Sequence, residues 1–148
     1  MTLRELEHWF EAFAAQYPHE KRGALEYVFE VPPDPDDPDE RCIVVVSYRK
    51  HDGLLVGTVA VRPWEPDGSL AIPLLRANFN CLNTRVGLHG DLVHVVYSRL
   101  LGHLGAEELS EAVFELAGIA TMLAAEDFAT SESTEQVSVD EEKHSKLN

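Results

Sequence analysis

The sequence predicts a single α+β domain in which helices pack against one antiparallel sheet. Three features indicate this class: helical spacing of apolar residues near both ends and in the middle of the chain, two-residue alternation between those stretches, and glycine-containing turns that join strands into hairpins. A chain of 148 residues has room for one hydrophobic core. We assign residues 1–129 to this domain, with the element order α-β-β-β-α-β-β-α.

The first element is predicted to be an amphipathic helix that starts after Thr2 and ends near Tyr17. Thr2 and Glu5 have the spacing of a capping box, which satisfies unpaired N–H groups of the first helical turn. Tyr17 precedes a proline and is therefore disfavoured in the helical conformation. The apolar stripe of this helix contains Leu3, Leu6, Phe10, Phe13 and Tyr17.

Three strands that form a meander are predicted next. Residues 24–30 alternate between two faces, whereas residues 42–48 are nearly all apolar or β-branched, as is typical of an inner strand. Residues 54–61 return after a tight turn in which Gly53 supplies a positive φ. Residues 32–40 contain four prolines and five acidic residues, so we expect an extended, solvated loop between the first two strands.

A short helix and a second hairpin are predicted to follow the meander. The helix covers residues 73–82, with proline tolerated in its first turn and apolar groups three and four residues apart. Residues 84–88 and 92–98 are predicted to be strands joined by a turn at Gly90. This hairpin completes the predicted sheet.

The last predicted element is a long helix after Gly105. Its apolar stripe runs through Leu109, Val113, Leu116, Ala120 and Leu123. Beyond residue 129 the chain is rich in Ser, Thr and Glu and has no apolar period, so we expect residues 130–148 to form an acidic, disordered tail.

The charge and cysteine content restrict the classes of function. With 26 acidic and 12 basic residues the net charge is −14, which disfavours direct binding to nucleic acid. No uncharged apolar stretch approaches the length of a membrane span, which is about 20 residues. Cys42 and Cys81 form neither a disulfide framework nor a CxxC pair. We therefore expect a cytoplasmic protein without a membrane or nucleic-acid partner.

The order of the elements resembles the type III secretion chaperone-like fold and its YbjN-like relatives over residues 2–129. The most suggestive segments are residues 74–83, which lead into the second hairpin, and residues 105–109, which open the final helix. Proteins of these families are small, acidic, usually homodimeric and without known chemistry, and the secretion chaperones hold an extended stretch of a client protein. The resemblance therefore implies a non-enzymatic, chaperone-like or adaptor protein that forms a homodimer and holds a segment of a partner protein.

Motifs for chemistry are absent from the sequence. No GxSxG, Walker or Gly-rich phosphate-binding pattern occurs, and packing in the interior is the better interpretation of the two thiols. The histidines do not have the spacing of metal ligands. They are His8, His19, His51, His89, His94, His103 and His144. We therefore predict neither a metal nor a cofactor, and no catalytic residue.

Two alternatives to a protein-binding module remain open at this stage. The first is a small ligand-binding domain or enzyme whose pocket is built from distant residues such as Asp91, His94 and Arg99. The second is a regulator that acts on nucleic-acid metabolism through a protein partner.

The predicted dimer or partner surface is either the middle helix with its neighbouring strand or a seam of small residues on the last helix. Gly118 supports the seam, because glycine inside a helix costs about 1 kcal/mol unless something uses the space. Strand addition to an exposed sheet edge is a plausible grip, and the acidic surface favours a basic or partly unfolded partner. The candidate residues are Leu74, Leu75, Asn78, Phe79, Leu82, Val113, Ala117, Gly118 and Ala120.

Overall fold

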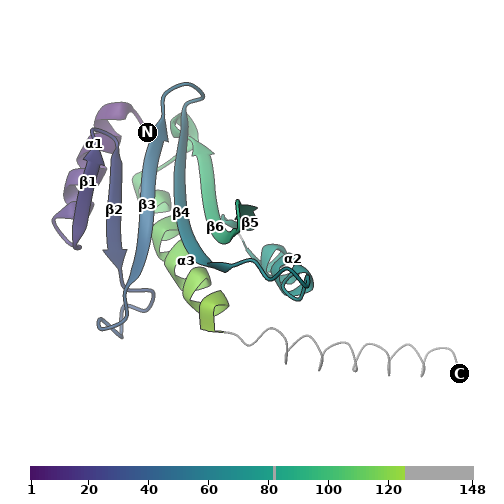
Figure 1. Cartoon of the computed structure of the whole chain (residues 1–148). Coiled ribbons are helices and arrows are strands. Elements are labelled where there is room, and N and C mark those ends of the chain that lie inside the picture. Colours follow the sequence, from purple (N-terminus) through teal and green to yellow (C-terminus); the bar gives the residue numbers. More distant parts are fainter. Residues whose placement is uncertain (82, 126–148) are drawn as a thin grey trace, which may run out of the picture.

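The computed structural model describes residues 1–81 and 83–125 and confirms the α+β class (Figure 1). Within these residues, three α-helices and a 3₁₀ turn accompany an antiparallel sheet of six strands, in the order β1-β2-β3-β4-β6-β5. The elements are α1 (Leu3–Ala14), β1 (His19–Gly23), β2 (Glu26–Val31), β3 (Cys42–Arg49), β4 (Leu54–Pro63), α2 (Ala71–Asn80), β5 (Arg85–His89), β6 (Leu92–Leu100), η1 (Leu101–His103) and α3 (Ala106–Ala125). The predicted tail, residues 130–148, lies outside the described residues.

The predicted elements occur in the predicted order, and the structure adds one strand, β1. This strand pairs with β2 at the edge of the sheet, and its side chains are almost all polar and exposed. Because an edge strand of this kind buries no face, it has no apolar alternation for the sequence to reveal. The middle helix begins two residues earlier than predicted and ends at Asn80.

The predicted turns and loop are present in the structure. Gly53 and Gly90 adopt φ values of 71° and 60° in the two hairpin turns, a region that favours glycine. Residues 32–41 contain no helix or strand, and the acidic part of this loop, Asp34–Glu40, is exposed. Thr2 caps α1 by accepting a hydrogen bond from the backbone N–H of Glu5.

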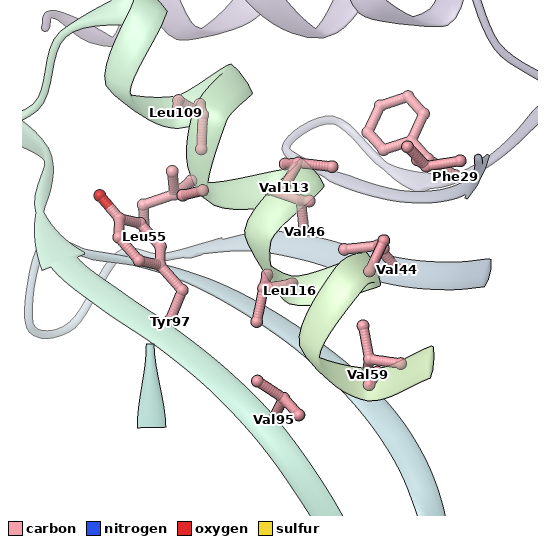
Figure 2. Packing of buried hydrophobic residues seen from close by; sticks show 14 of the residues in the cluster. Phe29, Val44, Val46, Leu55, Val59, Val95, Tyr97, Leu109, Val113 and Leu116 are labelled. Atoms are coloured by element: carbon pink, nitrogen blue, oxygen red, sulfur yellow. The ribbon is translucent and has the colours of Figure 1, made fainter. Parts of the chain in front are cut away.

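One face of the sheet is covered by α1 and α3, and the opposite face is open to solvent (Figure 1). Aromatic side chains of α1 pack on β2. Phe10 stacks on Tyr27 with 4.6 Å between ring centroids, and Phe13 meets Phe29 edge to face with 4.9 Å between centroids. Helix α3 crosses the central strands and buries Leu109, Val113 and Leu116 against them (Figure 2). The core is therefore a single layer between one sheet face and two helices.

Gly57 lies where Leu116 of α3 packs directly against the backbone of β4. It lies on the buried face of β4, between Val46 of β3 and Tyr97 of β6. A Cβ atom at this position would stand 2.7 Å from Cδ1 of Leu116, which is itself fully buried. The helix can lie this close only because the strand carries no side chain there.

Candidate functional site

Helix α2 presents an apolar stripe to solvent at the end of the sheet. Ile72, Leu75 and Phe79 follow one another at three- and four-residue spacing, so they share a helix face. Their exposed fractions are 41%, 68% and 91%. Leu74, on the opposite side of the same helix, is buried in the core. Helix α2 thus has two apolar faces, and the part of the chain that the structure describes covers only one of them.

Asn78 attaches α2 to the edge strand β5. Its side-chain amide donates a hydrogen bond of 2.9 Å to the carbonyl oxygen of Val86, and its side-chain oxygen accepts one from the Val86 N–H. These two groups of Val86 point away from β6, the other neighbour of β5. Asn78 therefore occupies the positions that an added strand would need at the centre of this edge.

The other outer edge of the sheet also opposes strand addition. Strand β1 carries Glu20, Lys21 and Arg22 as exposed side chains, and its pairing with β2 shifts register between Lys21 and Gly23. Charges and bulges are common devices by which proteins prevent pairing at an edge strand. Strand addition, one of the expected grips, would therefore have to displace Asn78 at the β5 edge, and at the β1 edge it would meet exposed charges and an irregular register.

The predicted seam on α3 is divided between the core and the surface. Val113, Ala117 and Ala120 are at most 3% exposed and face the sheet of the same chain, where their small side chains allow close packing. These three are therefore already covered by the chain's own strands. Gly118 is half-buried, and a Cβ there would meet no described atom within 4 Å.

Of the nine candidate residues, the structure brings together those on α2. Leu74 and Asn78 anchor the helix, whereas Leu75 and Phe79 face outward. Leu82 lies outside the described residues. Ile72 belongs to the same stripe but was not predicted. Its three-residue spacing from Leu75 places it on the same helix face and could have identified it from the sequence.

The three residues of the alternative pocket do not converge. His94 lies on the open face of β6, but Arg99 forms an ion pair with Glu108 of α3, beside the covered face. Asp91 lies in the hairpin turn, where its carbonyl oxygen accepts a hydrogen bond from the Trp64 N–H. An active site built from this trio is therefore not supported by the geometry.

His94 is nevertheless in an unusual environment for a surface strand. Its Nδ1 lies 3.3 Å from the Thr58 hydroxyl, and its buried Nε2 has no hydrogen-bond partner within the described part of the chain. Burial, with a smaller contribution from nearby His89, lowers the pKa of His94. The lowered pKa favours the neutral form of the ring.

The two thiols are half-buried and free. Burial is the main cause that raises the pKa of Cys42, partly offset by a hydrogen bond to Thr121. The thiol of Cys81 lies 3.1 Å from the carbonyl oxygen of Ala77, one turn earlier on α2. A raised pKa leaves less thiolate at neutral pH, so Cys42 does not have the properties of a nucleophile.

Residues 1–81 and 83–125 contain neither a candidate metal-binding cluster nor a candidate membrane-spanning helix. In this part of the chain, His, Cys, Asp and Glu side chains form no cluster of three or more that could hold a metal ion. None of its helices combines the length and apolar character that crossing a membrane requires.

Comparison with solved structures confirms the predicted resemblance. The chain shares the fold of YbjN. The crystal structure of YbjN from E. coli, a candidate transcription regulator, is 12% identical in sequence, with a TM-score of 0.53, and the match covers 91% of this chain and 94% of YbjN. The HopA1–SchA chaperone–effector complex also contains a similar chain, with 16% identity and a TM-score of 0.47. This match covers 79% of the present chain and 85% of the matched chain. No protein-family model and no curated protein sequence matches.

Proposed function

We propose that this chain is a non-enzymatic protein-binding module, of the chaperone or adaptor kind, that forms a homodimer through the exposed face of α2. The observation that carries this proposal is the stripe of Ile72, Leu75 and Phe79, in which the last side chain is 91% exposed. Large apolar side chains that gather on one exposed face are typical of a protein-interaction site.

The charge distribution favours a second copy of the chain as the occupant of this face. Residues 68–90 contain no Asp or Glu, although the whole chain carries 26 acidic residues. Two copies of so acidic a protein repel each other over most of their surfaces, and the repulsion is weakest where α2 and β5 meet. Leu88 of β5, 52% exposed, is a further apolar side chain in this stretch without acidic residues.

The dimer is tested by measuring molar mass with light scattering or sedimentation. We expect the full chain at micromolar concentration to have twice the mass of a single chain, and Phe79→Asp to have the mass of one. Met122→Asp is the matched control, because Met122 is also an exposed apolar residue on a helix, with 52% exposure, but lies on α3. A wild-type chain that stays monomeric, or a Phe79→Asp variant that stays dimeric, contradicts the proposed interface.

The binding role is tested separately by affinity capture from cell extract followed by mass spectrometry. Wild-type protein should retain a specific protein at low and moderate salt, and the bound set should be the same with Met122→Asp as bait. If no protein is retained above background at either salt concentration, the binding role is wrong even when the dimer is present.

A further inference from the structure

The sheet splits open between two of its central strands. The pairing of β3 with β4 begins where Arg49 lies opposite Leu54. It ends where Val45 lies opposite Thr58. Beyond that point β3 continues to pair with β2 as far as Cys42, and β4 continues with β6 as far as Pro63. Figure 1 shows the two strands diverging there, with α3 behind the gap. We call this opening the β3–β4 cleft.

The cleft is an open hollow with a mostly apolar lining. Its volume is about 670 Å³, within the range of roughly 300–1,000 Å³ that is usual for ligand pockets. Cys42 and Ile43 line one side and Ala60 and Val61 line the other. Small residues of the last turns of α3, including Ala124, form the floor. The space exists because these side chains are too short to fill it.

The walls of the cleft are strand backbones, which favours an extended peptide as the occupant. Along a strand, backbone N–H and C=O groups point alternately to the two neighbouring strands. Between residues 42–44 and 59–61, the groups directed into the cleft face a strand that has moved away. An extended segment can supply the missing hydrogen bonds and place alternate side chains in the cavity. The outer edges of the sheet, in contrast, are occupied or protected.

The charge around the mouth favours a basic occupant. The loop that enters β3 carries five exposed acidic residues between positions 34 and 40, and Glu40 lines the cleft itself. Arg41, which also lines the cleft, is the only basic residue between positions 32 and 48, against the five acidic ones. Ile43, 59% exposed on the open face, adds an apolar contact beside these acids. Acidic groups at a rim accelerate the approach of a basic partner, while apolar contacts hold it.

We infer that the β3–β4 cleft binds an extended segment of a partner protein in which apolar residues alternate with Lys or Arg. This inference rests on the proposed protein-binding function and names the site and the chemistry of what is held. The apolar side chains enter the cavity, the backbone pairs with the diverging strands, and the basic side chains contact the acidic loop.

The test uses the full chain and a short fluorescent peptide in which Val and Lys alternate. Binding is measured by fluorescence anisotropy, and the alkylation rate of Cys42 reports directly on the cleft in a Cys81→Ser background. We expect saturable binding that weakens as salt rises, together with slower alkylation of Cys42 when peptide is bound. A peptide with Glu in place of Lys should bind at least about tenfold more weakly.

Two Trp variants on the same helix separate the cleft from the rest of the surface. Ala124 is exposed and lines the cleft, so Ala124→Trp should fill it and weaken binding at least about tenfold. Met122→Trp introduces the same side chain at an exposed position outside the cleft lining and should bind the peptide like wild type.

Three results would overturn the inference. They are equal binding by Ala124→Trp and wild type, equal binding of the Lys and Glu peptides, and a rate of Cys42 alkylation that saturating peptide leaves unchanged. The last result would mean that the peptide binds outside the cleft. The molar mass of Phe79→Asp reports only on the α2 interface. If the wild-type chain is a dimer but does not bind the peptide, the inference about the cleft is wrong and the proposed dimer is unaffected.

Discussion

Replacing Gly57 with alanine tests how closely α3 packs on the sheet. The new Cβ would stand 2.7 Å from Cδ1 of Leu116, whereas carbon atoms in contact are normally about 3.5–4.0 Å apart. Because Leu116 is fully buried between the strands and the helix, it has little room to retreat. Overpacking of this kind costs about 1–3 kcal/mol.

Part of that cost is offset, because alanine restricts the unfolded chain more than glycine does, by about 0.4–1 kcal/mol. We therefore expect Gly57→Ala to lower the free energy of unfolding by about 1–2 kcal/mol and Tm by about 3–6 °C. Urea denaturation followed by circular dichroism gives the first quantity and thermal melting the second. Gly87→Ala is the matched control, since a Cβ on this exposed β5 residue would meet no described atom within 4 Å. It should leave stability unchanged or slightly raised.

A double-mutant cycle identifies the atom responsible. Leu116→Ala alone should cost about 2–5 kcal/mol, because it leaves a cavity under α3. In the double variant the new methyl group of residue 57 occupies part of that cavity. The loss of stability in the double variant should therefore be smaller, by at least about 1 kcal/mol, than the sum of the losses in the two single variants. If Gly57→Ala is as stable as wild type, or if the two costs simply add, the close approach of α3 does not depend on the missing side chain.

Two further predictions concern the α2 anchor and the histidine on the open face. Asn78→Ala should lower the free energy of unfolding by about 1–3 kcal/mol, because the Val86 N–H and C=O lose their partners; an unchanged urea midpoint would contradict this anchor. The pKa of His94 in the folded state is lowered from its ordinary value of 6.5, so the unfolded state binds the proton more readily. The free energy of unfolding should therefore fall as pH drops below 6.5, until the pH passes the folded-state pKa. His94→Gln should reduce this fall in urea midpoints measured between neutral and mildly acidic pH, and an identical pH profile would show that another group causes it.

The elements that bury apolar side chains could be predicted from the sequence. The stripes of α1 and α3, the alternation in β2 and the apolar run of β3 each record a face in contact with the core, and all four appear at the expected places. Strand β1 was missed because it buries almost nothing and depends on pairing with β2. The middle helix was predicted as an interaction surface, but its sequence could not separate Leu74, which is buried, from Phe79, which is exposed.

The sequence by itself determined the class of fold, the order of its predicted elements and the acidic character of its surface, since hydrophobic period, turn chemistry and charge are local properties of the chain. Only the tertiary structure decided which apolar faces remain uncovered. Helix α3 uses its small residues against its own strands, α2 leaves one face to solvent, and β3 separates from β4 above a floor of short side chains. Each of these outcomes depends on which segments distant in sequence become neighbours, because a side chain is buried only by what folds over it.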